Sequence, residues 1–319
     1  MSVGARIRTL LRRHTYAFAL LLVVVLLIVN ISIQPNINWT NLLASFAPLA
    51  IAAIASTPSI ISGRGGIDMS TSPVMTLSAI FFVSVLIPSG LGGIEAIPIV
   101  MLLGGAVGAA IGLIIVILRL SPIVVSLAAY FIVIGINLKI APRPVLMQGD
   151  NWVTSLSGSF GPVPAALVSI AIPVAIWAIL MSTSYGRNLY AIGGNDATAY
   201  SAGVPVSATR VIAFATGGAF AAFGGLVLVG LVRTADSSTS GAYTLMAIAA
   251  AALGGVSLTG GRGSVVGALL GAAAIFLIQS VLADLRMPPT WLPMVYGALL
   301  IVSVVLGSIL LGQKKGART

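Results

Sequence analysis

The chain has 319 residues, of which 58% are hydrophobic and only 7% are charged, and its mean hydropathy is +1.13. Soluble domains carry about 25% charged residues, because their surface faces water. A chain with so few charges cannot cover itself with polar groups, so its solvent must be largely lipid. The 36 glycines agree with this interpretation, since small residues let membrane helices approach each other closely.

Composition also excludes several classes of function. The formal net charge is +10, but no basic patch carries the aromatic or base-reading side chains that nucleic-acid binding requires. Cysteine is absent, which excludes disulfides and thiolate metal sites. The one histidine, His14, lies in the basic N-terminal tail. Metal ligands usually occur in clusters, so we predict no metal site in this chain.

The first apolar run extends from Tyr16 to Ile33 and follows a tail that contains Arg12 and Arg13. The run is about the length needed to span roughly 30 Å of hydrocarbon. It is longer than the apolar core of a signal peptide, and no small-residue cleavage site follows it. We therefore expect a retained first helix.

Apolar stretches bounded by glycine, proline and charged residues predict about ten membrane helices. In chain order they lie near residues 16–33, 42–62, 67–87, 94–118, 122–140, 163–183, 209–232, 242–258, 264–283 and 291–311. Segments this long and this continuously apolar are not barrel strands. We predict an all-α, polytopic membrane protein that forms a single transmembrane domain over residues 1–319.

The segment 242–258 is the weakest of these spans, because it is short and rich in alanine. Two interpretations remain open for it. It either crosses the membrane, or it forms a buried or re-entrant helix that neighbouring helices shield from lipid.

Basic residues predict the orientation, because loops on the cytoplasmic side carry an excess of lysine and arginine. If both termini are cytoplasmic, the outside loops hold only Lys139, Arg143, Arg233 and Arg286. The inside segments then hold Arg6, Arg8, Arg12, Arg13, Arg64, Arg119, Arg187, Arg210, Arg262, Lys314, Lys315 and Arg318. We therefore expect cytoplasmic N- and C-termini.

The inside loop at about 184–208 contains signals for a short helix. Asn195 is a suitable N-cap, and Asp196 would lie in the first turn, where the helix dipole favours negative charge. Gly203 would end the helix, and Pro205 would prevent its continuation. A helix of about seven residues is not stable alone in water, so another surface must hold it. That surface is either the chain's own loops or a partner protein.

Asp68 follows a glycine-rich turn at the start of an apolar helix. A charge at the bilayer centre costs about 2.5–3.5 kcal/mol, so this acid should lie at an interface or in a polar cavity. Its role is either to stabilise the helix N-terminus or to form a polar part of a gate on a substrate pathway. The surrounding segment 63–68 resembles segment 260–264, through either chance or duplication.

Segment 254–264 is also rich in glycine, but it lacks the lysine of a phosphate-binding P-loop and lies between membrane helices. We predict no catalytic residue and no cofactor in this chain. The outside loops, including the polar segment at about 141–162, carry charges of both signs that suit docking of a soluble partner. Plain solvation is the alternative for these candidate docking residues, which are Arg143, Asp150, Arg233, Asp236, Asp284 and Arg286.

The predicted spans contain no series of ionisable side chains. Ion-coupled carriers usually have such residues within the membrane, so a secondary transporter of a small polar solute, working without an ATPase, is the less favoured alternative. The charged rings and vestibules of a selective channel are not visible either.

Several motifs together carry a family resemblance. They are Gly65-Gly66-Ile67-Asp68-Met69-Ser70, Gly186-Arg187 with Tyr190-Ala191-Ile192-Gly193-Gly194-Asn195, Ile248-Ala249-Ala250, Leu253-Gly254-Gly255 and Gly260-Gly261-Arg262-Gly263-Ser264. In this order the motifs resemble the ribose-type permeases of bacterial ATP-binding-cassette importers, which also include permeases for xylose, galactosides and autoinducer-2. The likeness covers essentially the whole chain. Branched-chain amino-acid permeases are more distantly similar.

The resemblance implies a multi-pass protein of the bacterial plasma (inner) membrane that transports a small polar solute such as a monosaccharide. It implies a second permease subunit, identical or paralogous, and an extracytoplasmic binding protein. It also implies two cytoplasmic ATPase subunits, which would hold the ATP and magnesium. The helix near 195–203 would then be the coupling helix that contacts the ATPase, through Gly194, Asn195, Asp196 and Ala199.

Overall fold

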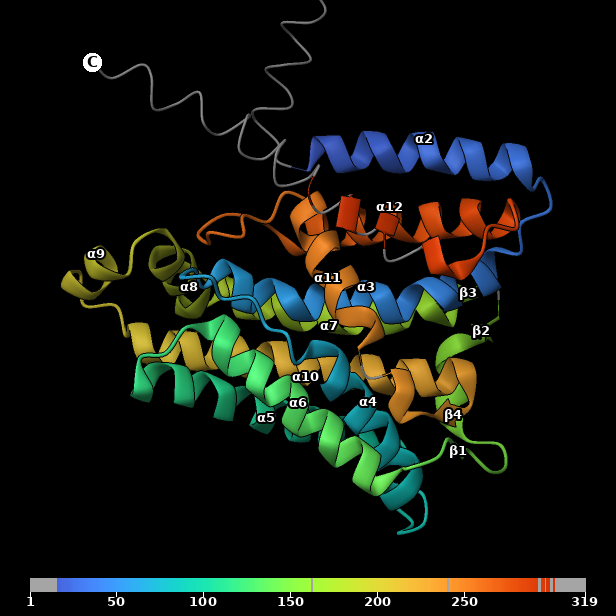
Figure 1. Ribbon diagram of the computed structural model, residues 1–319, viewed down its shortest axis with the longest axis horizontal. Coiled ribbons are helices and arrows are strands. Elements are labelled where there is room, and N and C mark those ends of the chain that lie inside the picture. Colours follow the sequence, from blue (N-terminus) through green and yellow to red (C-terminus); the bar gives the residue numbers. More distant parts are fainter. Residues whose placement is uncertain are drawn as a thin grey trace, which may run out of the picture.

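Figure 1 shows the computed structural model of the chain. The structure describes residues 16–161, 163–239 and 241–291, together with residues 294, 295, 297, 298 and 301. The basic tail before residue 16 and the C-terminal tail lie outside the described residues, as does most of the predicted span 291–311. The predictions made for those segments therefore remain predictions.

Helices dominate the described residues, and the short strands found among them lie in the connections between helices. The helices are α2 (Ala17–Ile33), α3 (Trp39–Ile61), α4 (Thr71–Phe81), α5 (Ala96–Leu118), α6 (Pro122–Ile140), α7 (Ala165–Ser182), α8 (Ser184–Gly194), α9 (Asp196–Ser201), α10 (Val206–Val232), α11 (Ala242–Leu253) and α12 (Val265–Asp284). A π-helical turn, η1 (Phe82–Leu86), continues α4, and the 3₁₀ turns are η2 (Trp152–Ser157), η3 (Ser237–Thr239) and η4 (Pro289–Trp291). The strands are β1 (Val145–Leu146), β2 (Ser159–Phe160), β3 (Val163–Pro164) and β4 (Thr234–Ala235).

Among the described residues, 6 helices are long and apolar enough to cross a membrane, namely α3, α5, α6, α7, α10 and α12. α2 and the continuous unit of α4 and η1 are shorter apolar helices. All of these elements lie within a few residues of a predicted span. The structure therefore confirms a predominantly helical chain with several membrane-spanning segments.

The predicted span 242–258 is a shorter element in the structure. Its helix, α11, has 12 residues, which corresponds to about 18 Å and is too short to cross roughly 30 Å of hydrocarbon as a helix. Its residues from Ala247 to Ala251 are all buried. The helix therefore ends earlier than the predicted bound of residue 258, and its burial agrees with the alternative of a helix that neighbouring helices shield from lipid.

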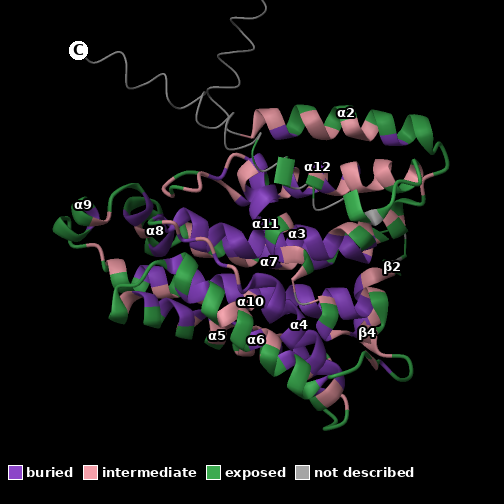
Figure 2. Cartoon of the chain, in the orientation of Figure 1, coloured by how far each residue is buried: buried purple, intermediate pink, exposed green. Residues whose placement is uncertain are grey.

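The core of the bundle is built around α3 and α10. Every residue of α3 from Ala47 to Ile61 is buried, and α10 packs against α3, α4 and α5 (Figure 2). α11 and α12 pack against each other and against α3, while α2 covers α12. α2 is tied to α12 by Asn30, whose buried side-chain amide donates a hydrogen bond to the carbonyl oxygen of Leu277 at 3.2 Å.

The outer helices expose large apolar side chains. Leu102 and Ile117 on α5 are 73% and 70% exposed, and Phe131 on α6 is 64% exposed. Soluble monomers rarely expose contiguous apolar surface of this kind, because water solvates it poorly. This pattern is the one expected for helices that face lipid or another membrane subunit.

Glycine allows α5 and α10 to approach each other to backbone contact. A Cβ atom added to Gly104 would overlap the carbonyl oxygen of Gly218, and one added to Gly108 would overlap the carbonyl oxygen of Phe214. This close approach is the packing that small residues permit between membrane helices.

Two small antiparallel pairs of strands lie at the end of the bundle opposite α9 (Figure 1). In one pair Val145 is opposite Ala235 and Leu146 is opposite Thr234, and in the other Ser159 is opposite Pro164. The prediction of an all-α chain did not include these strands. The first pair joins segments far apart in the sequence, so no local pattern could have indicated it.

We expect Gly104→Ala to destabilise the bundle, because its methyl group would meet backbone atoms of α10 that cannot move aside. Overpacking of this kind costs about 1–3 kcal/mol. The neighbouring Gly105→Ala is the matched control, since an added Cβ there meets its nearest atom at 3.6 Å, an ordinary contact. Thermal unfolding of both variants in detergent should show a lower melting temperature for Gly104→Ala alone. Equal melting temperatures would contradict the close contact.

Candidate functional site

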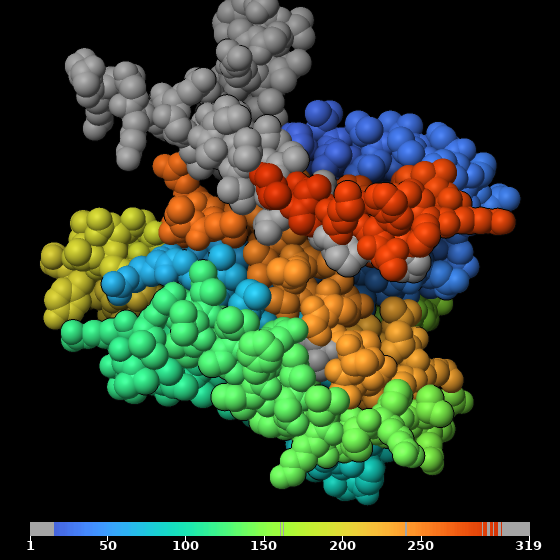
Figure 3. Space-filling view, viewed as in Figure 1, coloured from blue at the N-terminus to red at the C-terminus, as the bar shows by residue number. Residues whose placement is uncertain are grey.

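The segment between α7 and α10 forms two short helices, α8 and α9, at one end of the molecule (Figure 3). Thr183 caps α8 by accepting a hydrogen bond from the backbone N–H of Tyr185 at 3.2 Å. Asn195 caps α9 by accepting from the N–H of Thr198 at 3.0 Å, and Gly203 follows with a φ of 79°. The predicted short, capped helix is thus confirmed, whereas α8 was not predicted as a separate helix.

A charge cluster holds α9 to the bundle. Asp196, in the first turn of α9, accepts hydrogen bonds from Nη2 of Arg210 at 2.7 and 2.9 Å. Nε of Arg64 lies 3.3 Å from the same carboxylate. The Arg210 side chain is only 5% exposed, and its Nη2 also lies 3.4 Å from the carbonyl oxygen of Ser62. The chain's own loops therefore supply a surface that supports this six-residue helix.

Two glycine-containing loops meet the last turn of α8, which contains Gly193. The backbone N–H of Gly261 donates to the carbonyl oxygen of Ile61 at 3.0 Å. A Cβ atom on Gly193 would overlap both of those groups, and a Cβ atom on Gly260 would overlap the Cα of Gly63. The two segments that resemble each other in sequence, 63–68 and 260–264, therefore lie side by side. We call this contact of Gly63, Gly193, Gly260 and Gly261 the glycine junction.

Tyr190 fastens α8 to the same place. Its hydroxyl donates a hydrogen bond to the carbonyl oxygen of Gly263 at 2.7 Å. Burial raises the pKa of Tyr190 above its usual value of 10.0, so the hydroxyl keeps the proton that it donates at neutral pH. α8, the glycine junction and the start of α12 are thereby connected.

The predicted coupling residues lie close together but differ in exposure. Gly194 and Asn195 are exposed, Asp196 is half-buried, and Ala199 is buried against the chain itself at 5% exposure. Ala199 therefore supports α9 from within. The sequence reasoning missed Tyr200, whose side chain is 76% exposed at the tip of α9. An aromatic residue in an otherwise small and polar helix was the signal that would have found it.

A second site lies inside the bundle, where the N-terminal ends of α4 and α11 meet. The backbone N–H of Ser72 donates to Oγ1 of Thr244 at 3.2 Å, and the N–H of Tyr243 donates to Oγ of Ser72 at 3.2 Å. The hydroxyl of Thr244 donates to the carbonyl oxygen of Met69 at 3.1 Å. We call these residues the buried junction. Both helices start there after irregular backbone, which lipid tolerates only where protein covers it.

Asp68 lies next to the buried junction and is 3% exposed. Its carboxylate accepts hydrogen bonds from the backbone N–H and the hydroxyl of Ser70, at 2.8 and 2.7 Å. The bonds form a turn just before α4, which agrees with a structural role at a helix start. A role in a gate remains a prediction.

The predicted docking residues are spread over the end of the molecule opposite α9. Nη2 of Arg233 lies 3.8 Å from Oδ1 of Asp150, and both side chains are largely exposed. Asp236 bonds its own turn, accepting from the N–H and hydroxyl of Ser238 at 2.8 and 2.7 Å. The remaining predicted residues, Arg143, Asp284 and Arg286, form no ion pair with a described residue.

Metal binding has no support in the part of the chain that the structure describes. No three histidine, cysteine, aspartate or glutamate side chains gather there. The interactions found at both sites are hydrogen bonds, ion pairs and close backbone contacts, which position helices relative to one another.

Comparison with known proteins agrees with a transport function. A family described as the permease component of branched-chain amino acid transport systems matches residues 38–304. The ribose import permease of Haemophilus influenzae is 31% identical over 97% of this chain and 96% of its own length. That of Bacillus subtilis is 32% identical over 93% and 91%. A galactose/methyl galactoside import permease of Haemophilus influenzae is 28% identical over 96% and 97%. No solved structure matches this chain.

The fold and the comparisons together define a multi-pass transport protein of the bacterial inner membrane rather than an enzyme. The chain belongs to the family of permease components of branched-chain amino acid transport systems, and the relatives compared above are named ribose and galactose/methyl galactoside import permeases.

We expect Gly193→Ala to loosen the glycine junction, because its methyl group would overlap the backbone at the end of α3 and in the loop that contains Gly261. The expected loss of stability is about 1–3 kcal/mol. Gly194→Ala is the adjacent control, since an added Cβ there meets nothing within 4 Å. Limited proteolysis at α8 and α9 should speed up for Gly193→Ala and not for Gly194→Ala. Equal cleavage rates would show that α8 and the two loops are not in contact.

Proposed function

We propose that this chain is the permease subunit of an ATP-binding-cassette importer for a monosaccharide or a similar hydroxylated solute. Its relatives in Haemophilus influenzae and Bacillus subtilis are named ribose import permeases, and both align with nearly the whole chain. The ATP and magnesium belong to separate ATPase subunits in this proposal.

The orientation that we propose follows from the charges at the two ends of the bundle. The end that carries α9 is rich in arginine and has the half-buried Asp196 as an acid, whereas the opposite end has acids and bases in similar number. The arginines at the α9 end are Arg64, Arg119, Arg187, Arg210 and Arg262. The positive-inside rule therefore supports a cytoplasmic location for α9. Both termini would also be cytoplasmic if the chain crosses the membrane about ten times, as its apolar segments predict.

Two of these crossings would not be simple helices. The first of these crossings would consist of the segment before α4 together with α4 and η1. The second would consist of β4, η3 and α11. Each would combine irregular backbone with a short helix, and the two meet at the buried junction. Glycines with positive φ accompany both, including Gly63 at 79° and Gly260 at 94°. Hinges are a few loop or terminal residues that absorb changes in φ and ψ, so these breaks suit a bundle with two states.

The single observation that carries the proposal is the geometry of α9. The helix is held from behind by Asp196, which bonds both Arg210 at the start of α10 and Arg64 in the loop after α3. Its outer surface, with Gly194, Asn195 and Tyr200, is exposed. A force applied to that surface would therefore reach two core helices directly. This arrangement supports α9 as the coupling helix, with Gly194, Asn195, Asp196 and Ala199 as coupling residues.

Coupling would act by shifting a population. If the ATPase subunits hold α9 in different positions with and without bound ATP, they favour one of two bundle states by their difference in affinity. The solute needs no covalent chemistry in this scheme. It passes when the favoured state changes from outward-open to inward-open, with the turn at Asp68 near the part that moves.

The opposite end would receive the solute from an extracytoplasmic binding protein. Charges of both signs are exposed there, and complementary charges favour rapid, specific docking. We propose that Arg143, Asp150, Arg233, Asp236, Asp284 and Arg286 contribute to this surface. A second permease subunit, identical or paralogous, would cover part of the exposed apolar surface of the outer helices.

We expect Tyr200→Ala to weaken binding of the ATPase subunit, since exposed aromatic residues at the tip of a docking element often carry much of the binding energy. Such anchors typically contribute about 2 kcal/mol or more, which corresponds to roughly thirtyfold in affinity. Ser201→Ala, on the same exposed helix, is the control. Co-purification of the ATPase with each variant measures the effect.

Ala199→Pro tests the same helix through its backbone. Proline removes the N–H that donates to the carbonyl oxygen of Asn195 at 3.0 Å, so α9 should unfold while membrane insertion is retained. ATPase binding and solute-stimulated ATP hydrolysis should both be lost. Normal coupling in both Tyr200→Ala and Ala199→Pro would reject α9 as the coupling helix.

An ion-coupled carrier is the alternative function, and vesicles distinguish the two. We expect the purified chain alone to show no sugar uptake when a proton or sodium gradient is imposed. Uptake should require the ATPase subunit and internal ATP, because the described spans offer no series of ionisable groups to carry ions. Gradient-driven uptake by the chain alone would establish the carrier instead.

A further inference from the structure

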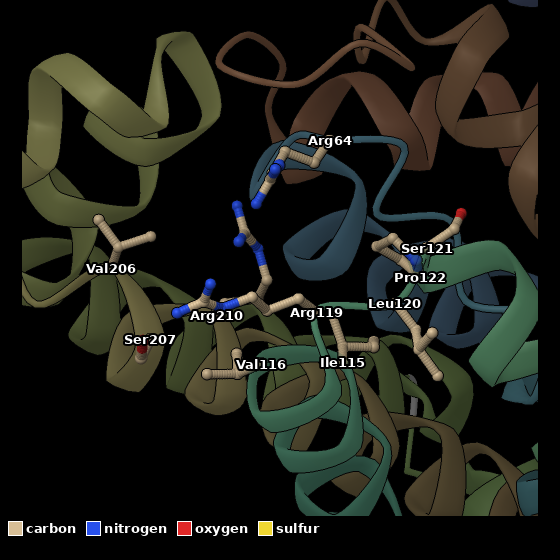
Figure 4. A pocket seen from close by; sticks show the side chains of 10 residues that line it. All are labelled: Arg64, Ile115, Val116, Arg119, Leu120, Ser121, Pro122, Val206, Ser207 and Arg210. Carbon is tan, nitrogen blue, oxygen red and sulfur yellow. The ribbon is translucent and has the colours of Figure 1, made fainter.

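A cavity of about 360 Å³ lies beside the charge cluster of α9, between the end of α5, the start of α6 and the start of α10 (Figure 4). Arg64, Arg119 and Arg210 line it, together with Ser121 and Ser207, and no acidic residue is among its lining residues. The transport mechanism proposed above uses Arg64 and Arg210 to hold α9. It gives no role to Arg119 or to the cavity.

The cavity has an excess of positive charge. Figure 4 shows the side chains of Arg64, Arg119 and Arg210 gathered around the cavity. Asp196 neutralises part of this charge through Arg64 and Arg210, but Arg119 makes no hydrogen bond or ion pair with any described residue. Nε of Arg210 is buried without a hydrogen-bond partner among the described residues. Like charges placed this close favour binding of an anion.

The backbone around the cavity also points to a ligand. Arg64 and Arg119 both adopt left-handed conformations, with φ of 54° and 53°, which are unfavourable for residues with a Cβ. Such conformations tend to occur at ligand-binding sites. α6, a helix of 19 residues, begins at the cavity with Ser121 as an N-cap that makes no side-chain capping bond. The partial positive charge of that helix end adds to the attraction for an anion.

The surroundings indicate where the anion comes from. Next to the cavity, α5 and α6 expose apolar side chains, with Ile117 at 70%, Leu118 at 60% and Val124 at 60%. A polar cavity that opens onto lipid-facing helices matches a ligand with an anionic head and apolar tails. Basic pockets between membrane helices on the cytoplasmic side bind the head groups of anionic lipids.

We propose that this cavity binds the phosphate group of an anionic phospholipid, with Arg119 as its principal contact and the acyl chains along α5 and α6. The leaflet is the cytoplasmic one if α9 is cytoplasmic, so that detail rests on the proposed function. Because the loop of Arg64 also carries the glycine junction, a bound lipid would stabilise the segment that supports α9.

The full-length chain, purified in a neutral detergent, provides the test. Bound lipid is measured by native mass spectrometry during titration with phosphatidylglycerol, with phosphatidylcholine or with inorganic phosphate. We expect phosphatidylglycerol to bind more tightly than phosphatidylcholine. Its affinity should fall about five- to tenfold in Arg119→Gln and recover in Arg119→Lys, as one surface arginine contributes roughly that much. Arg187→Gln removes an exposed arginine from the same end and should have no effect.

Several results would overturn the proposal. Equal affinity of the original chain and Arg119→Gln would do so, as would an equal loss in Arg187→Gln, which indicates diffuse attraction. Inorganic phosphate that competes fully with the lipid would identify a free anion as the ligand. If Arg119→Gln fails to fold, the original chain still tests the proposal. Equal binding of phosphatidylglycerol and phosphatidylcholine to that chain would overturn it. Lipid binding is measured without the ATPase. A result that overturns the lipid proposal therefore leaves the proposal of α9 as the coupling helix intact.

Discussion

The structure depends on one constraint, which is that backbone N–H and C=O groups inside a membrane must find hydrogen-bond partners within the protein. The chain interrupts its helices before α4 and before α11, which would be costly in contact with lipid. It brings both interruptions together at the buried junction, where Ser72 and Thr244 bond each other and the nearby backbone. α4 packs against α10 and α11 packs against α3, so this irregular backbone lies inside the bundle.

Close backbone contact is the second requirement. Glycine permits it at two places, between α5 and α10 and at the glycine junction. Gly104 and Gly218 let two long helices touch, so the core has little space to rearrange. At the glycine junction, the same property lets two loops meet the last turn of α8. The two contacts therefore have different roles. The contact of α5 with α10 fixes these helices relative to each other, whereas the glycine junction connects α8 to the end of α3 and the start of α12.

Charge is concentrated at the surface that this framework supports. Asp196 connects a six-residue helix to a nearly buried arginine of α10, and salt screens this pair less than it screens an exposed one. The arginines around it exceed the acids, so the same cluster provides both a mechanical attachment and an anion-binding cavity. The ATPase, acting on α9, and the lipid, bound in the cavity beside it, would thus act on neighbouring parts of the chain.

The sequence by itself determined the class of fold, the positions of most helices and the cap of α9. These features depend on local patterns, namely apolar length, capping residues and the sidedness of basic residues. Only the tertiary structure decided which loops meet. The resemblance between segments 63–68 and 260–264 was ambiguous as a pattern, and their contact through Gly63 and Gly260 became visible only in three dimensions. Arg210 could be predicted as a cytoplasmic charge but not as the partner of Asp196, and Arg119 could not be predicted to line a cavity. Contacts between distant residues depend on how whole helices pack, and local sequence does not encode that geometry.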